Sequence, residues 1–524
     1  MISPEAGATP PPDEASDGTG PDVSAGTTAS SAAGHPIRRN VLVLFGGQAT
    51  TWTMTLLWTL VVPRLLGPAG IGLITSVWAV AAIFSIMLGL GTENYLAREL
   101  VAEPANSGRL VGSALVLRVV MTPLFVAGAI AFAHFAHYGS QARLVLWLAT
   151  AATLFTILDD PLCSAFEARE RMEYMAYSTV IEKSSQGLVG IVIVVIGFGA
   201  VGLTASWLAV SILVLLFGFR WMRPLMTIEL RTSVRELTGL VRASAAYFAS
   251  GVFYLIYLWI DSVMLSLMTR NEVVGWYAVP TKILGTLLFV PVVISTAWAP
   301  RLVRTFETSE DDLREAARSP LELVLILSLP LCALAALAAQ PLIPLLYGHA
   351  FQNSVPVMVI LGLTIVPMYA NIIFAQILVS MRRQARLTWL LVAAALVNPA
   401  LNFYFIRLTQ HRYHNGAIGA AICMLLTELL IVSAEIMLVG RRFLGSASVF
   451  RVVRAAVASG GMWAVGYAAR PLGWYVSLPL AGLAFVFLAW LLRVVGPTEK
   501  EALLAEWAKI IGRFRRGRSV ASKE

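Results

Sequence analysis

The residues of this sequence that could do chemistry are charged side chains placed inside long apolar segments. Three of them are cations, namely Arg118, Lys183 and Lys282. A charge at the centre of a bilayer costs about 2.5–3.5 kcal/mol unless it faces water, an opposite charge or a ligand. These side chains are therefore candidates for binding an anionic group inside a cavity. A structural ion pair, or a side chain that extends to the lipid headgroups, explains each of them equally well.

Acidic side chains occur in the same segments and form a second set of candidates. The acids nearer the predicted cytoplasmic side are Glu93, Asp159 and Asp160. Asp261 and Glu428 lie deeper within apolar runs. Asp261 and Lys282 fall in the outer halves of consecutive segments, which predicts an ion pair between neighbouring helices. Either Asp261 or Glu428 could instead carry a coupling proton.

Motifs for metal, nucleotide or covalent chemistry are missing from the sequence. The histidine pairs His134/His137 and His411/His414 have i, i+3 spacing near the predicted outer surface, where contacts with lipid headgroups explain them better than a metal ion does. The three cysteines are far apart and lie inside apolar runs. No nucleotide-binding P-loop and no nucleophile motif occurs. We therefore expect no cofactor, no metal and no enzymatic activity.

Composition places these side chains in a membrane protein. Of the 524 residues, 58% are apolar and 13% are charged, whereas roughly a quarter of the residues of a soluble protein are charged. The mean hydropathy is +0.75, and the apolar runs have the length of about 20 residues that a helix needs to cross the hydrocarbon core. The sequence excludes a soluble enzyme and a free nucleic-acid binder, and it predicts an all-α polytopic membrane protein.

Fourteen transmembrane helices are predicted. They lie at 41–63, 72–97, 110–134, 143–165, 177–198, 201–221, 243–268, 275–300, 319–340, 353–379, 386–406, 416–440, 452–470 and 474–495. If the N-terminus is cytoplasmic, 30 of the 39 Lys and Arg residues lie on the cytoplasmic side and six lie outside. Because cytoplasmic loops carry the excess of Lys and Arg, both termini are predicted to be cytoplasmic.

Two six-helix lobes around a central cavity are predicted, at residues 37–221 and 243–440. Gly72 and Gly275 recur at an offset of 203 residues, and so do Arg98 and Arg301. Six is an even number, so the two lobes would have the same orientation in the membrane and would be related by an axis along its normal.

The remaining segments are assigned from composition and periodicity. Residues 1–36 are rich in small residues and predict a disordered cytoplasmic tail. Residues 222–242 predict a cytoplasmic amphipathic linker with a short surface helix, in which Ser233 and Glu236 form a capping box. Residues 441–495 hold transmembrane helices 13 and 14, and residues 496–524 predict a basic amphipathic cytoplasmic tail.

Five stretches carry a family resemblance. The first half contains "PRLLGPAGIGLITSVW" and "LGLGTENYLARELV", and the second half contains "WIDSVMLSLMTRNEVVGWYAVPTKIL" and "ALVNPALNFYFI" followed by "NGAIGAAICMLLTE". In this order and spacing they resemble the polysaccharide (O-antigen type) flippase family of the multidrug, oligosaccharidyl-lipid and polysaccharide exporter superfamily. The resemblance runs from about residue 38 to 495. It places Asp261, Tyr277 and Lys282 on one family pattern, and Asn398 and Asn402 on another.

The resemblance implies two lobes that rock about a central cavity. They would move a polyprenyl-diphosphate-linked oligosaccharide from the inner to the outer leaflet of the bacterial cytoplasmic membrane, for surface polysaccharide biosynthesis. The predicted partners are this substrate, membrane lipid, a polysaccharide polymerase and glycosyltransferases, without nucleic acid. The substrate-binding candidates are Arg118, Lys183, Lys282, Asn398 and Asn402.

Two alternative functions remain open. A cation-coupled multidrug antiporter of the same superfamily would favour an apolar cavity with one or two acids over a cavity with several cations. A membrane-embedded polysaccharide polymerase or acyltransferase would need a large outer loop or a reactive His or Asp motif, and the sequence contains neither.

Overall fold

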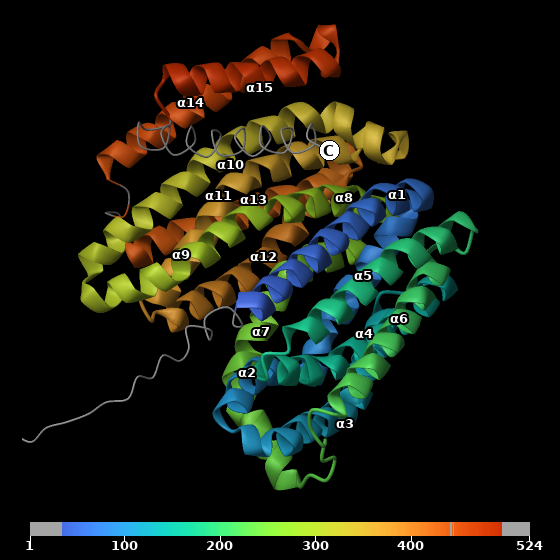
Figure 1. The fold of residues 1–524 in the computed structure, drawn as a ribbon. Helices are drawn as coiled ribbons and strands as arrows, with labels where there is room; N and C mark the ends of the chain where they lie inside the picture. Colours follow the sequence, from blue (N-terminus) through green and yellow to red (C-terminus); the bar gives the residue numbers. More distant parts are fainter. Residues whose placement is uncertain (1–33, 441–442, 444, 495–524) are drawn as a thin grey trace, which may run out of the picture. The chain divides into compact units, whose positions relative to one another are not determined.

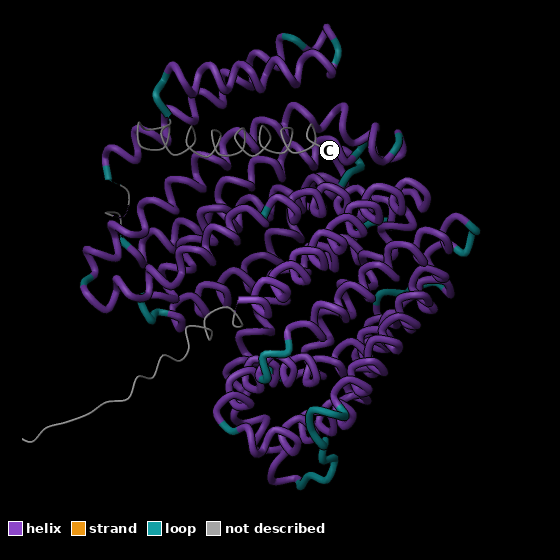
Figure 2. Tube along the Cα trace, in the orientation of Figure 1, coloured by secondary structure: helices purple, strands orange, loops and turns teal. Residues whose placement is uncertain are grey.

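The chain folds almost entirely into α-helices (Figure 1). The computed structural model describes residues 34–440, 443 and 445–494, and these residues contain no β-strand (Figure 2). Residues 47–524 form one compact unit and residues 1–46 another. All packing described below lies within residues 47–524. The predicted tail at 1–36, apart from residues 34–36, and the predicted tail at 496–524 lie outside the described residues.

The helix boundaries follow the ends of the apolar runs. The helices before the predicted linker are α1 (Gly34–Gly89), α2 (Thr92–Ala102), α3 (Ser107–Phe135), α4 (Ser140–Ala168), α5 (Met172–Val195) and α6 (Gly199–Met222). The helices after it are α7 (Val234–Met268), α8 (Asn271–Leu287), α9 (Phe289–Thr308), α10 (Glu310–Tyr347), α11 (Ser354–Ser380), α12 (Gln384–Tyr413), α13 (Gly416–Val439), α14 (Ser446–Ala468) and α15 (Trp474–Leu491).

Twelve helical segments in the described part of the chain are long and apolar enough to cross a membrane. Each of the fourteen predicted segments lies on one helix or on two consecutive helices. A helix satisfies its backbone hydrogen bonds internally, which lipid cannot do for it, so an apolar run of this length has no other stable conformation in a bilayer. The prediction of an all-α polytopic membrane protein is confirmed.

Helix α1 differs from the predicted boundaries, because it contains the first predicted segment and most of the second. Gly67 has φ 68° and ψ 176° and precedes Pro68, so the helix is kinked where the sequence predicts an outer loop. The second predicted segment is also interrupted. Leu90 and Gly91 both have positive φ, and α2 begins after them.

The predicted linker at 222–242 does not contain a separate surface helix, and that expectation is wrong. Ser233 and Glu236 do form the predicted capping box, but the helix that they cap is α7, which continues without a break. The chain before α7 is extended and lies against the start of α3, where the Glu229 backbone N–H donates to the Gly108 carbonyl at 3.1 Å. A backbone segment can approach α3 so closely because Gly108 has no Cβ.

Helices α14 and α15 pack against each other, and both contact α10 (Figure 1). Arg451 of α14 forms an ion pair with the buried Glu322 of α10, with 2.6 Å between Nε and Oε1. The two C-terminal helices therefore attach to the bundle through one helix of the predicted second lobe.

Helices α1 and α8 cross with their backbones in contact. A Cβ on Gly72 would overlap the Asn271 carbonyl and would lie 2.8 Å from the Gly275 nitrogen. A Cβ on Gly275 would overlap the Pro68 carbonyl. Pro68 and Asn271 are separated by the same 203 positions as Gly72 and Gly275, so the contact is reciprocal, as in a two-fold symmetric interface. The repeated glycines meet each other at the end of the helices that the charge distribution assigns to the outer side.

Candidate functional site

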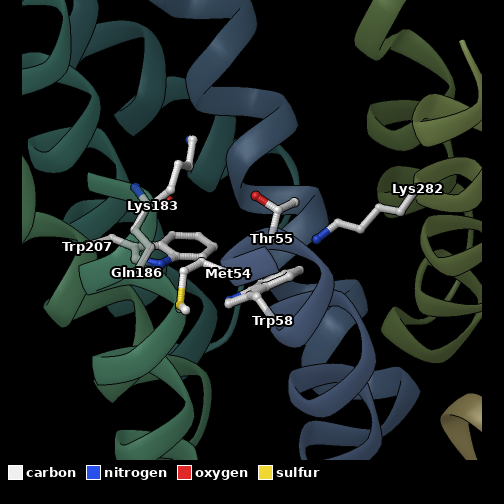
Figure 3. Close-up of a pocket in the computed structure, with 8 residues that line it drawn as sticks. Met54, Thr55, Trp58, Lys183, Gln186, Trp207 and Lys282 are labelled. Carbon is white, nitrogen blue, oxygen red and sulfur yellow. The ribbon is translucent and has the colours of Figure 1, made fainter. Parts of the chain in front are cut away.

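A cavity of about 220 Å³ lies among α1, α5, α6 and α8, within the membrane-spanning segments. It is lined by Met54, Thr55, Trp58, Lys183, Gln186, Gly187, Trp207 and Lys282. In Figure 3, Lys282 extends from α8 toward Trp58 of α1, while Lys183, Gln186 and Trp207 approach from the other side. Two helices separated by about a hundred residues thus place two lysines at one cavity.

Lys282 has an aromatic partner and no acidic one among the described residues. Its Nζ lies 3.3 Å from the centroid of the Trp58 ring, in a cation–π contact that joins α8 to α1. The expected ion pair between Asp261 and Lys282 is not formed in this part of the chain. A cation that lines a cavity without a counter-ion is suited to binding an anion.

Lys183 is held by an acceptor on its own helix. Its Nζ lies 2.9 Å from Oε1 of Glu182, which also accepts from Gln186 Nε2 at 3.0 Å. The charge of Lys183 acts on Lys282 and repels it. The cavity therefore carries two lysines of different kinds. Lys183 is paired with Glu182, whereas Lys282 has no acidic partner among the described residues.

Tryptophans form the apolar part of the cavity wall. The ring centroids of Trp58 and Trp207 are 6.1 Å apart, and Trp78 packs edge-on against Trp207 at 4.9 Å. The indole N–H groups of all three are buried and have no hydrogen-bond partner among the described residues. A buried indole N–H usually donates to an acceptor, so these three groups lack a partner that burial normally requires, while the rings of Trp58 and Trp207 line the cavity.

Arg118, predicted as a third cavity cation, does not line this cavity. It is 1% exposed on α3, and its Nη1 donates to the Ala114 carbonyl at 3.4 Å. The acids whose charges act on it are Asp160 of α4 and the exposed Glu93 of α2. Arg118 thus lies in an electrostatic cluster within the first predicted lobe.

Asp159, the remaining acidic candidate of the first predicted lobe, is buried on α4. Its Oδ2 accepts from Cys163 Sγ at 3.3 Å, whereas its Oδ1 has no partner among the described residues. The side chain lies close to Gly218 of α6, where a Cβ would be 2.5 Å from Oδ1. Asp159 therefore sits at the α4–α6 packing interface, outside the cavity.

Asn398 and Asn402, also predicted to bind substrate, instead belong to a buried hydrogen-bond network in the second predicted lobe. Asn402 Nδ2 donates to Asp261 Oδ1 at 2.6 Å and to Asn398 Oδ1 at 2.5 Å, and Asn398 Nδ2 donates to Thr427 Oγ1 at 3.2 Å. The Tyr277 hydroxyl donates to the other oxygen of Asp261 at 2.8 Å. Both oxygens of Asp261 therefore accept a hydrogen bond.

Glu428 lies in a similar environment one helix away. It is fully buried on α13, and it accepts hydrogen bonds from the Tyr257 hydroxyl of α7 and from Asn371 Nδ2 of α11, the latter at 3.0 Å. Three helices thus converge on one carboxyl group. No cation is paired with Asp261 or Glu428 in the described part of the chain.

Some site residues were not found by sequence reasoning. Trp58 is the partner of Lys282, but it lies five residues before the end of the predicted span 41–63, where a tryptophan is ordinary, so the sequence carried no signal for it. Glu435 is a further acid within the predicted span 416–440, and it lies two helical turns beyond Glu428. It could have been found from the rule that a charged group at membrane depth needs a reason.

Metal binding finds no support in the described residues, where no group of three or more His, Cys, Asp or Glu side chains could hold a metal ion. His411 and His414 line a shallow cavity at the end of α12 together with Arg407. His134 and His137 lie at the end of α3 and in the turn that follows it.

Comparisons with known proteins bear on the family and the fold of the chain. The model of a family described as "Polysaccharide biosynthesis protein" matches residues 37–306, which is more than half of the chain. A comparison with curated protein sequences finds no match.

Solved structures show a shared fold. A structure titled "Lipid II flippase MurJ, inward closed conformation" has a TM-score of 0.69 at 12% identity and covers 86% of this chain and 98% of its own. An inward-facing multidrug resistance MATE family transporter of the MOP superfamily has a TM-score of 0.60 at 16% identity, with 76% and 95% covered. A MOP superfamily transporter from Pyrococcus furiosus has a TM-score of 0.51 at 16% identity, with 77% and 94% covered.

Proposed function

The chain belongs to the polysaccharide biosynthesis protein family, and from this premise we propose that it translocates a polyprenyl-diphosphate-linked oligosaccharide across the cytoplasmic membrane of a bacterium. The observation that carries the proposal is Lys282, a cation that lines a membrane-embedded cavity and has no acidic partner among the described residues. Movement from the inner to the outer leaflet would occur by alternating access.

The cavity has the chemistry that a diphosphate headgroup requires. The ligand brings at least two negative charges, and charge-assisted hydrogen bonds from Lys183 and Lys282 would offset its lost hydration. Its binding would also relieve the repulsion between the two ammonium groups. Trp58 and Trp207 line the cavity, and their ring faces can pack on a sugar ring.

The crossing of α1 and α8 supports loading from the cytoplasmic side. Gly72 and Gly275 bring two backbones together at the predicted outer end, and this contact supports a conformation that is closed on that side. The headgroup would enter from the cytoplasmic side while the polyprenyl tail stays in the bilayer. Release to the outer leaflet would require this contact to open.

The competing function is multidrug antiport, since a MATE family transporter shares the fold. Such transport would bring a lipophilic cation to the two lysines, where like charges repel. The two functions therefore predict opposite ligand preferences for the same cavity.

Ligand-induced thermal stabilisation of the purified protein tests the proposal. A polyprenyl-diphosphate oligosaccharide present at 100 times its Kd should stabilise the protein by about 2.7 kcal/mol, whereas the free sugar at the same concentration should have far less effect. Lys282→Gln should reduce the shift in Tm, and Lys282→Arg should retain part of it. Arg270→Gln is the matched control, because this arginine is 85% exposed and pairs with Glu272 outside the cavity.

Two outcomes contradict the proposal. Equal stabilisation by the free sugar would show that the diphosphate is not recognised. Stabilisation by lipophilic cations in place of the diphosphate, unchanged in Lys282→Gln, would favour the antiporter.

A further inference from the structure

Glu435 is a buried carboxyl group that the proposed substrate cavity does not use. It lies on α13 with 0% of its surface exposed, and neither of its oxygens has a hydrogen-bond partner among the described residues. Glu428 is equally buried, but both of its oxygens accept hydrogen bonds. An ionised carboxylate that is buried without donors is strongly unfavourable, so burial of this kind favours the neutral acid.

The ionisable groups around Glu435 do not neutralise the negative charge that it would carry if it were ionised. Glu428 lies seven residues earlier on the same helix face, and its charge acts on Glu435. Two acids that interact in this way cannot both ionise freely. The helices that contact α13 are α7, α8, α11 and α12. Their ionisable groups are Arg235, Glu236, Arg242, Tyr247, Tyr254, Tyr257 and Asp261 of α7, Glu272, Tyr277 and Lys282 of α8, Tyr369 of α11, and Arg386, Tyr404, Arg407, His411, Arg412 and Tyr413 of α12. None of these groups forms a hydrogen bond or ion pair with Glu435.

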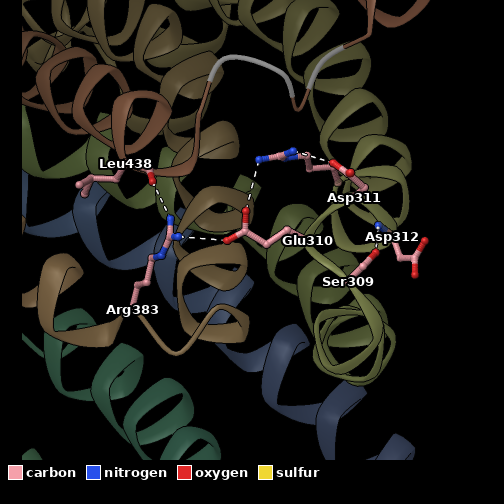
Figure 4. A network of polar contacts seen from close by, with 7 residues as sticks. Ser309, Glu310, Asp311, Asp312, Arg383 and Leu438 are labelled. Atoms are coloured by element: carbon pink, nitrogen blue, oxygen red, sulfur yellow. Dashed lines mark hydrogen bonds and ion pairs between the residues drawn. The ribbon is translucent and has the colours of Figure 1, made fainter.

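One cation, Arg383, lies at the nearby end of α13. Its Nη1 donates to the Leu438 carbonyl at 3.0 Å, three residues after Glu435, and its Nη2 lies 3.2 Å from Oε1 of Glu310 (Figure 4). Glu310 is 47% exposed at the start of α10 and is shared with Arg314. Arg383 is therefore engaged with a surface acid and a backbone carbonyl, one helical turn from the buried acid.

We propose that Glu435 is a proton-binding residue that couples transport to proton movement, with Arg383 as its alternative partner. This inference rests on the proposed transport function. In the present conformation Glu435 holds its proton and Arg383 binds Glu310. When the end of α13 opens, the O–H bond of Glu435 breaks and the proton passes to water at the side that the charge distribution assigns to the cytoplasm. Arg383 then leaves Glu310 and pairs with the carboxylate.

The proton-binding residue and the proposed substrate cavity are separate sites. Glu435 does not line the cavity of Lys183 and Lys282, so a proton bound there acts through the packing of α13 on α11 and α12. Substrate recognition and proton binding can therefore be removed independently.

Infrared spectroscopy of the purified protein detects the bound proton directly. The carbonyl stretch of a protonated carboxyl group should lose intensity equal to one group in Glu435→Gln. The matched control is Glu322→Gln, which removes a buried glutamate whose Oε1 lies 2.6 Å from Nε of Arg451. A carboxyl group in an ion pair should not contribute to this band, so the variant should leave the band unchanged. An unchanged band in Glu435→Gln would overturn the proposal.

The same carbonyl band, measured as a function of pH, tests the role of Arg383. In Arg383→Gln the Glu435 carboxylate has no cation to pair with, so its ionised form is less stable than in the wild type. The contribution of protonated Glu435 to the band should therefore persist to higher pH than in the wild type. Loss of this contribution at the same pH as in the wild type would exclude Arg383 as the alternative partner.

Transport in liposomes tests the coupling. The wild type should move lipid-linked oligosaccharide several-fold faster with an imposed pH gradient than without one. Glu435→Gln should show the same rate in both conditions and keep the substrate-induced shift in Tm. A wild-type gradient response in this variant would refute the coupling role. Absence of any substrate-induced shift in Tm in the wild type would refute the proposed function instead. The infrared measurement would still decide whether Glu435 binds a proton, because it does not depend on the substrate.

Discussion

The two predicted lobes use their buried polar groups in different ways. In the first, residues 37–221, the cavity wall carries donors without partners, such as the indole N–H groups of Trp58 and Trp207. In the second, residues 243–440, the buried acids Asp261 and Glu428 accept hydrogen bonds from neighbouring helices, and Glu435 is the exception. Unsatisfied groups at a cavity indicate ligand binding, whereas a satisfied network stabilises one packing of the helices.

The glycines of the repeat lie where the two predicted lobes touch. Gly72 and Gly275 make reciprocal backbone contacts at an offset of 203 residues, but no counterpart of the Asp261 network occurs among the described residues of the first lobe. The repeat therefore preserves the crossing of the helices, while each predicted lobe carries its own chemistry. Four predictions test this division.

The largest effect is expected at the crossing itself. Gly72→Ala should lower the free energy of unfolding by about 3 kcal/mol, because the new Cβ overlaps a backbone carbonyl that cannot move aside like a side chain. Chemical denaturation in detergent micelles measures this loss. Gly285→Ala is the control, since a Cβ there meets nothing within 4 Å and the substitution should be neutral or slightly stabilising. Equal effects at both positions would show that the crossing is not tightly packed.

The next effect separates the network from the cavity. Asn402→Ala should cost about 1–3 kcal/mol of stability, because it removes the donor from two buried oxygens, those of Asp261 and Asn398. Gln186→Ala, at the partly exposed cavity wall, should change stability by less than about 0.5 kcal/mol. A larger loss of stability for Gln186→Ala than for Asn402→Ala would show that the cavity wall stabilises the fold more than the buried network does.

A smaller effect is expected where the first lobe contacts the start of α7. Arg109 of α3 forms an ion pair with Glu236, and the two side chains are 58% and 30% exposed. Arg109→Ala should cost about 0.2–1 kcal/mol, and less at high salt, because exposed ion pairs are weak and screened. Denaturation at low and high ionic strength gives both values. A salt-independent loss above that range would indicate a packing role for this arginine.

The smallest effect concerns Asp261 and Lys282, which have different partners in the structure. Asp261 accepts from Asn402, and Lys282 contacts Trp58. A double-mutant cycle with Asp261→Asn and Lys282→Gln should give an interaction energy in stability below about 0.5 kcal/mol, as expected for side chains without a shared partner. Rescue of either single variant by the other would restore the ion pair predicted from the sequence. It would also connect the network to the cavity.

The sequence alone determined the class of protein and the course of the chain. Apolar runs of about 20 residues form helices in lipid whatever they pack against, because the backbone has no other donors or acceptors there. Local signals also placed the Ser233–Glu236 capping box correctly. The same locality explains the misjudged surface helix, since a capping box marks where a helix begins and says nothing about where it ends.

Tertiary structure alone decided which charged residues share a site. Hydropathy identifies Arg118, Lys183 and Lys282 as equivalent, but only the packing of α1, α5 and α8 brings the two lysines to one cavity and leaves Arg118 buried elsewhere. In a membrane the outer face of a helix is as apolar as its packed face, so the sequence pattern does not reveal which face meets which neighbour. For the same reason the pairing of Lys282 with Trp58, in place of Asp261, could not be predicted from the sequence.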